Sequence, residues 1–237
     1  MTHVWFDLDD TLIDFRGNSR IALAQFYRIE GLERLYPDAD AWIENYEYHN
    51  RGLWEQYNRG EIERDYLRVQ RFLRPLVDAG MAADEALSLA AGYDRLYLDL
   101  LAAQPGTIEG ARELVGYFRD RGYFVGVLSN GFTDVQSRKI ETAGLMPFIN
   151  KVVLSDDIGV NKPDRRLFDY AAEVSGETDP RRHVMVGDNP VTDIQGAVGA
   201  GWQAIHFDPD GRSDGLFRHR VVRVGRLDEI PPLFART

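Results

Sequence analysis

Polar side chains that could do chemistry stand directly after short apolar segments of this 237-residue chain. Asp7 and Asp9 follow the first such segment, Ser129 follows a second, Asp188 follows a third, and Lys162 lies in a loop before a proline. Taken singly, an Asp after a strand is usually a helix cap or a turn residue. Their repeated position favours a common site, because parallel strands bring such ends to one edge of a sheet.

The types of these side chains indicate phosphoryl chemistry assisted by a metal ion. The three acids offer oxygen ligands and the chain contains no cysteine, a donor set that suits Mg²⁺ rather than zinc. Three acids packed together would repel one another without a divalent cation. The serine adds a hydrogen-bond donor and the lysine adds a positive charge, and such a set can position and neutralise a phosphoryl group.

The apolar segments have the length and composition of buried strands in a parallel sheet. Helical patterns alternate with them, which indicates βαβ units and an α/β fold with a Rossmann-like parallel sheet. We expect the strands at residues 3–8, 124–128, 152–154, 184–186 and 204–207.

Two helix boundaries can be inferred from capping residues. The sequence Thr-Asp-Val-Gln at 133–136 is typical of a capping box and predicts a helix that runs to Gly144. Asn189 precedes a proline, which predicts a helix N-terminus there and an end near Gly199 or Gly201.

Residues 15–101 depart from this alternation. They contain no strand-like segment and helical periodicity dominates them, so we expect an α-helical domain inserted after the first strand. The chain would return at the turn 104–106, followed by a helix capped at Thr107. The expected division is residues 1–14 with 102–237 for the sheet domain and 15–101 for the insertion.

The overall composition limits the partners and the location. The formal net charge of −10 argues against nucleic acid as a partner. No stretch of about 18 apolar residues occurs, and the first residues lack the basic and apolar regions of a signal peptide. We therefore expect a cytoplasmic protein without a membrane partner, either a monomer or a homodimer.

Residues 7–11, Asp-Leu-Asp-Asp-Thr, resemble the DxDxT signature of the haloacid dehalogenase superfamily of phosphohydrolases. Ser129 after its apolar segment resembles the second motif of this superfamily, Lys162 before a proline resembles the third, and residues 187–193 match the fourth, GDxxxxD. All four occur in the order of the family. Any one of these motifs alone is weak, whereas the four together are specific.

This resemblance implies roles for the motif residues. Asp7 would be the nucleophile that forms an aspartyl-phosphate, and Asp9 would protonate the leaving oxygen and then deprotonate water. Magnesium would bind the Asp7 carboxylate, the Asp9 backbone carbonyl and Asp188. Asp193, also a candidate metal ligand, would hold metal-bound water or orient Lys162.

Other residues would contact the phosphoryl oxygens and the rest of the substrate. By the same resemblance, Ser129 and the Asn130 amide would hold the phosphoryl oxygens, with Gly131 beside them and Lys162 as the cationic catalytic residue. Phe15 lies in the segment after the first motif, which would face the substrate.

The insertion occupies the place of the C1 cap of the superfamily, which closes over small substrates. Residues 53–62 and 129–133 are similar to segments of bacterial pyrimidine 5′-nucleotidases, which dephosphorylate nucleoside 5′-monophosphates such as UMP, dUMP and dTMP. The resemblance thus implies a small phosphorylated metabolite, above all a pyrimidine nucleotide, as the substrate. Most cap aromatics are expected in its core, with Trp54 and Tyr57 as candidates to touch the base.

Other functions share part of this motif set. An acylneuraminate 9-phosphatase, a sugar-phosphate phosphatase or a phosphosugar mutase has every motif, so only substrate assays separate them. A dehalogenase of the superfamily needs the nucleophile but not the second acid, and Asp9 argues against it. A receiver domain also uses Asp, Mg²⁺ and Lys, but it is much shorter and lacks a cap.

Overall fold

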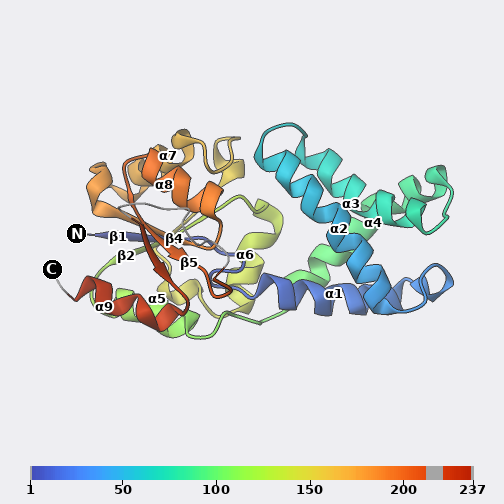
Figure 1. Ribbon diagram of the computed structural model, residues 1–237, viewed down its shortest axis with the longest axis horizontal. Coiled ribbons are helices and arrows are strands. Elements are labelled where there is room, and N and C mark those ends of the chain that lie inside the picture. The colour runs from blue at the N-terminus through green and yellow to red at the C-terminus, as the bar shows by residue number, and fades with distance from the viewer. Residues whose placement is uncertain (1, 212–220, 236–237) are drawn as a thin grey trace. The chain divides into compact units, whose positions relative to one another are not determined.

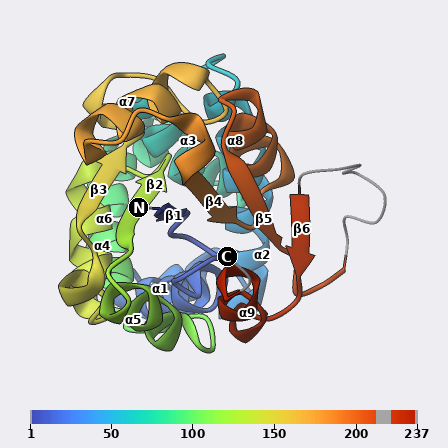
Figure 2. The ribbon, with the colours of Figure 1, turned by 90° about the vertical axis from the view of Figure 1, so that its left-hand side faces the viewer.

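In the computed structural model, which describes residues 2–211 and 221–235, six strands form one parallel sheet. The order β3-β2-β1-β4-β5-β6 means that the sheet grows from β1 to one side and then, from β4, to the other (Figure 2). The strands are β1 (His3–Phe6), β2 (Phe124–Ser129), β3 (Lys151–Leu154), β4 (His183–Gly187), β5 (Gln203–Phe207) and β6 (Val221–Val224).

The predicted α/β fold with a parallel sheet is confirmed. All five expected strands are present, although β1 ends at Phe6 because the chain turns after it: the backbone N–H groups of Leu12 and Ile13 both donate to the carbonyl of Leu8. The sequence does not predict β6, since Val224 is the only buried residue of this short edge strand.

The chain divides into two compact units, Met1–Phe15 with Pro105–Thr237, and Arg16–Gln104. The helices of the first unit are α5 (Ala111–Asp120), α6 (Thr133–Thr142), α7 (Arg165–Ser175), the π-helical turn η5 (Pro190–Gln195), α8 (Gly196–Gly199) and α9 (Pro231–Phe234). The helices that build the second unit are α1 (Phe15–Ile29), α2 (Ala39–Asn58), α3 (Arg64–Asp78) and α4 (Ala83–Ala102).

Helices cover both faces of the sheet because its strands are apolar on both sides. Val4 and Phe6 of β1 pack in a core with Phe118 of α5 and Ile140 of α6. Trp5, between them, packs in the opposite core with residues of α7 and α8. Figure 1 shows α7 and α8 on one face of the sheet and α5 with α9 on the other. Buried cores on both faces fix the register of β1, and so the position of the loop that follows it.

The second unit is a helical bundle around an aromatic core, as expected for most of its aromatic residues. The rings of Phe26 and Trp42 stack with centroids 5.6 Å apart, and Phe72 packs against both Tyr46 and Tyr97. All five side chains are buried. That this unit acts as a cap over a substrate stays a prediction.

Two expected helix caps are wrong. Helix α5 begins at Ala111 after Gly110, whereas Thr107 forms an isolated bridge to Ile13. Helix α6 begins at the predicted place, but Thr133 does not form the expected capping box: its hydroxyl and its backbone N–H both donate to Oδ2 of Asp156, at 3.0 and 3.1 Å. The cap at Asn189 is confirmed, because its side chain accepts from two backbone N–H groups of η5.

None of the helices in the described part of the chain is both long enough and apolar enough to span a lipid bilayer.

Candidate active site

The candidate site lies at the carboxyl ends of β1 and β4, the adjacent strands between which the sheet changes its direction of growth. Ligand sites of open parallel sheets lie at such a point, because the loops after the two strands diverge there. Asp7 follows β1, and its backbone N–H donates to the carbonyl of Val186 in β4 at 2.8 Å. Asp188 follows β4 directly. The parallel ladder therefore places these two acids side by side.

Lys162 is buried among carboxylates at this edge. Its Nζ donates to Asp7 Oδ1 at 2.6 Å, to Asp193 Oδ1 at 2.7 Å and to the carbonyl of Leu128 at 2.7 Å. Burial alone would lower the pKa of Lys162, but the carboxylates of Asp193 and Asp7 raise it above its ordinary value. The site thus holds a permanent cation against Asp7.

Asn130 fixes the loop that carries this lysine. Its side-chain oxygen accepts from the backbone N–H of Lys162 at 2.7 Å, and its Nδ2 donates to the carbonyl of Lys162 at 3.0 Å. The Asn130 side chain is therefore occupied with the loop. The expected contact of the Asn130 amide with phosphoryl oxygens stays a prediction.

Three carboxylates form a compact acidic cluster. One oxygen each of Asp7, Asp188 and Asp193 lies within 4.8 Å of the other two. Burial, followed by the charges of Asp193 and Asp7, raises the pKa of Asp188 to about 8. Burial also raises the pKa of Asp7 to about 7 despite the opposing charge of Lys162. An all-oxygen cluster in which Asp7 and Asp188 are this hard to ionise suits a hard divalent cation such as Mg²⁺.

The turn after β4 explains the spacing of the fourth motif, residues 187–193. Asp193 lies in η5, the turn that follows β4. Its Oδ2 accepts a hydrogen bond from the backbone N–H of Asn189 at 3.0 Å, and its Oδ1 accepts one from Nζ of Lys162. A Cβ on Gly187 would lie 2.3 Å from Asp193 Oδ2, so only glycine allows this close approach. Asp193 therefore contacts Lys162, and that it orients this lysine, one of the two roles expected for it, stays a prediction.

Ser129 ends β2 and is buried. Its Oγ accepts from the backbone N–H of Gly131 at 3.1 Å and from Nε2 of Gln136 at 2.8 Å. Since two donors already point at this oxygen, the hydroxyl proton is the group that Ser129 can give to a phosphoryl oxygen.

Asp9 lies beside two residues that the sequence analysis does not assign to the site. Its carboxylate forms an ion pair with Lys139, and its Oδ2 accepts from Nε2 of Gln136 at 3.1 Å. The capping-box pattern predicts a different partner for Gln136, because in such a box its side chain would accept a hydrogen bond from the backbone N–H at the start of the helix. The signal that could have found both residues is their position on the buried face of α6, between Val135 and Ile140.

The remaining predicted contacts belong to both units. The ring of Phe15 lies 5.1 Å from Lys139 Nζ, so this residue is near Asp9's ion-pair partner. Trp54 and Tyr57 lie in α2 of the second unit, half-buried, with their rings edge to face at 5.5 Å. Their contact with a substrate stays a prediction.

This arrangement of residues can support phosphoryl transfer. A buried carboxylate of the acidic cluster lies against a lysine, and a second acid follows two residues later in the chain. These are a nucleophile, a candidate general acid and groups that neutralise charge, which are the parts that such a reaction needs.

Comparisons with known proteins agree with this chemistry. The family model for haloacid dehalogenase-like hydrolases matches residues 1–201. Pyrimidine 5′-nucleotidase PynA of Streptococcus pneumoniae is 31% identical over 204 residues, which cover 86% of this chain and 82% of that protein. Pyrimidine 5′-nucleotidase YjjG of Escherichia coli is 29% identical over 88% of this chain and 89% of that protein.

A solved structure shows the same fold. The HAD-hydrolase YfnB of Bacillus subtilis, bound to magnesium, superimposes with a TM-score of 0.87 over 99% of this chain and 98% of that chain, at 24% identity.

Proposed function

This chain belongs to the haloacid dehalogenase-like hydrolase family and is a phosphatase, and we propose that it removes the phosphate from pyrimidine nucleoside 5′-monophosphates through an aspartyl-phosphate. The observation that carries the chemistry is the contact of Lys162 with both Asp7 and Asp193 beside Asp188. The substrate class rests on the two named nucleotidases at about 30% identity.

The proposed reaction has two steps. An oxygen of Asp7 attacks phosphorus while the bond from phosphorus to the leaving oxygen breaks, and the protonated Asp9 gives its proton to that oxygen. Asp9 then takes a proton from water, whose oxygen attacks phosphorus as the bond to Asp7 breaks. The products are an alcohol and inorganic phosphate, and both carboxyl groups return to their starting state.

The chain's own residues hold the phosphoryl group during both steps. The hydroxyl of Ser129 donates to its oxygens, and the ammonium of Lys162, whose three hydrogens point at Asp7, Asp193 and the carbonyl of Leu128, neutralises their charge. We propose that Asp7, the Asp9 backbone carbonyl and Asp188 would hold Mg²⁺, with Asp193 orienting Lys162. When bound there, Mg²⁺ neutralises charge on the phosphoryl oxygens and the attacking carboxylate.

We expect Asp188→Asn to raise the melting temperature of the metal-free protein while abolishing its response to Mg²⁺. The pKa of Asp188 is raised from 3.8 to about 8, so its ionisation opposes folding progressively as the pH rises from about 4 to 8. An amide carries no such charge, and at pH 8.5 in EDTA the variant should melt at least about 2 °C above the wild type. Differential scanning calorimetry with EDTA or Mg²⁺ measures both effects.

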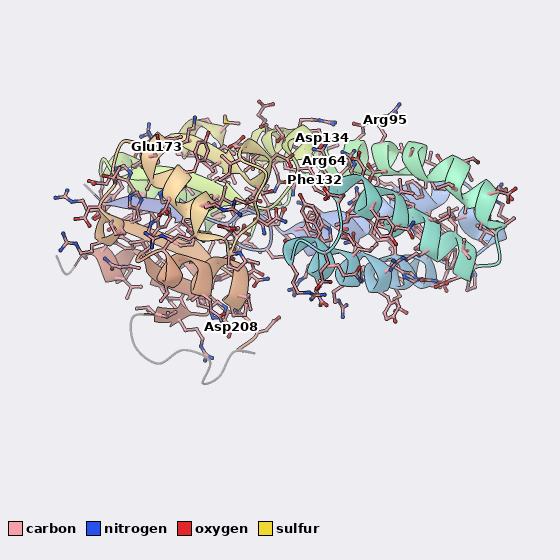
Figure 3. All side chains as sticks on the ribbon, turned by 90° about the horizontal axis from the view of Figure 1, so that it is seen from above. Arg64, Arg95, Phe132, Asp134, Glu173 and Asp208 are labelled. Carbon is pink, nitrogen blue, oxygen red and sulfur yellow. The ribbon has the colours of Figure 1, made fainter. Side chains whose placement is uncertain are left out.

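Glu173→Gln provides the matched control, because this acid is exposed on α7 (Figure 3) and is not one of the three clustered carboxylates. It should melt like the wild type and keep the stabilisation by Mg²⁺. A wild type that Mg²⁺ does not stabilise, or an Asp188→Asn variant that it stabilises equally, would contradict the proposed metal site.

We expect kcat/KM for dUMP, UMP or dTMP to exceed that for glucose 6-phosphate at least about tenfold. A base can stack on aromatic faces for about 1–3 kcal/mol, and 1.4 kcal/mol is a tenfold difference in affinity. Glucose 6-phosphate has no flat apolar face to gain this contact. Phosphate release across a panel of nucleotides, sugar phosphates and acylneuraminate 9-phosphate, with Mg²⁺, measures the order.

Variants on α2 test where the selectivity arises. Trp54→Ala or Tyr57→Ala should reduce the preference for nucleotides more than the rate on para-nitrophenyl phosphate. Tyr48→Ala is the matched control, because Tyr48 lies on the same helix with 73% of its surface exposed. A sugar phosphate or acylneuraminate 9-phosphate that outruns every nucleotide would overturn the nucleotidase proposal and leave the phosphatase intact.

A further inference from the structure

Helix α6 buries two polar side chains that most helices would expose. Gln136 is 0% exposed and Lys139 is 2% exposed, and they lie three residues apart on the face that also buries Val135 and Ile140. Lysine is almost never fully buried unless it is paired, because its charge must leave water. The partners of these two side chains therefore indicate why they are inside.

The partners are the second acid of the first motif and the serine of the second. Lys139 Nζ pairs with Oδ1 of Asp9 and donates to Oε1 of Gln136 at 2.8 Å. Gln136 Nε2 donates to Oδ2 of Asp9 at 3.1 Å and to Ser129 Oγ at 2.8 Å. Because lysine can only donate, the amide oxygen of Gln136 must face it, and the two amide hydrogens then point at Asp9 and Ser129.

We propose that Gln136 and Lys139 are positioning residues that hold Asp9 in register with Ser129, so that the general acid stands at a fixed place relative to the phosphoryl group. The inference rests on the proposed function. Each oxygen of Asp9 accepts one bond from α6, and a carboxyl oxygen has a second lone pair with which it can carry the transferred proton. The pair thus orients Asp9 without occupying it fully.

The backbone beside this network leaves room for it. A Cβ on Gly131 would lie 2.0 Å from Gln136 Nε2, so a side chain at that position would displace the amide from Ser129. The ring of Phe15 lies 5.1 Å from Lys139 Nζ, a contact that adds cation–π attraction and limits where the ammonium can move. Both features confine the two donors to Asp9 and Ser129.

The test compares two substrates of matched shape in single-turnover release of the alcohol with Mg²⁺. Phenyl phosphate depends on a proton from the general acid more than para-nitrophenyl phosphate does, since its leaving group is the more basic. Lys139→Met removes the charge and keeps the length of the side chain. It should slow phenyl phosphate at least about tenfold more than para-nitrophenyl phosphate, part of the 10²–10⁴-fold that a general acid supplies.

Arg138→Met is the matched control, since it removes one positive charge from an exposed position of the same helix. It should slow both substrates equally little. In the Asp9→Asn background, Lys139→Met should add less than about a twofold loss, because the residue that it positions can no longer give a proton. Gln136→Met and Lys139→Gln are measured with the same two substrates and should also slow phenyl phosphate more than para-nitrophenyl phosphate. The result then does not depend on the folding of one variant.

Equal slowing of both substrates in these variants, or an undiminished effect of Lys139→Met in the Asp9→Asn background, would overturn the positioning role. A wild type that hydrolyses neither substrate would instead contradict the proposed function. The two failures are therefore distinguishable.

Discussion

We expect Asp7→Asn to abolish turnover, with a loss of at least about 10⁴-fold, while the protein stays folded. The amide keeps the shape of the carboxylate but removes the electron-rich oxygen that would attack phosphorus. The fold should tolerate the change because burial already opposes the charge of Asp7 and raises its pKa to about 7. Its Oδ1 would still accept the hydrogen bond that Lys162 now donates at 2.6 Å.

Steady-state phosphate release and thermal melting measure the two parts of this expectation. Intact-mass spectrometry of the same sample must show that no amide has hydrolysed back to the acid. Glu173→Gln, which neutralises an exposed acid, should retain full activity. Activity above a few per cent of the wild type in an unhydrolysed sample would show that Asp7 is not the nucleophile.

The sheet and its acidic edge could be predicted because their causes are local in sequence. Strands buried on both faces are short and continuously apolar, and the ladder between β1 and β4 then brings their ends together. Asp7 and Asp188 follow directly from that rule. The cap at Asn189 could be predicted for the same reason, since its partners are the next two backbone N–H groups of the turn.

The residues that were missed or misassigned have partners distant in sequence. Gln136 fits a capping box with Thr133, but its donors reach Asp9, 127 residues away, and tertiary contacts outweigh the local pattern. Thr107 could cap a helix, yet it bridges Ile13 on the other side of the insertion. Neither contact can be predicted from the residues that lie next to Gln136 or Thr107 in the sequence. The spacing that puts Lys139 on the same helix face as Val135 and Ile140 is the signal that the sequence offers for this residue.

We expect Lys162→Met to remove activity and most of the stability of the metal-free site together. The ammonium is 2% exposed and is the cation that both Asp7 and Asp193 contact. Without it, two buried carboxylates would face each other beside Asp188, and breaking a buried ion pair costs about 3–5 kcal/mol. We therefore expect a large fall in urea midpoint in EDTA at pH 8.5, where these acids carry the most charge.

Mg²⁺ should separate the two losses. A divalent cation among the carboxylates restores part of the missing positive charge, so it should recover part of the stability of Lys162→Met. It should leave kcat/KM at least about 10³-fold below the wild type, because the positive charge that Lys162 places beside Asp7 and the phosphoryl group is still absent. Urea unfolding and phosphate release, each with and without Mg²⁺, measure the two effects.

Lys151→Met is the control for charge alone, since Lys151 is exposed at the start of β3. It should change neither the urea midpoint nor the rate appreciably. If Lys162→Met unfolded like Lys151→Met in EDTA, Lys162 would not be the counter-charge of the buried acids. If Mg²⁺ restored its full rate, Lys162 would serve only to hold the acidic cluster together, and the phosphoryl group would be neutralised by the other residues at this edge of the sheet.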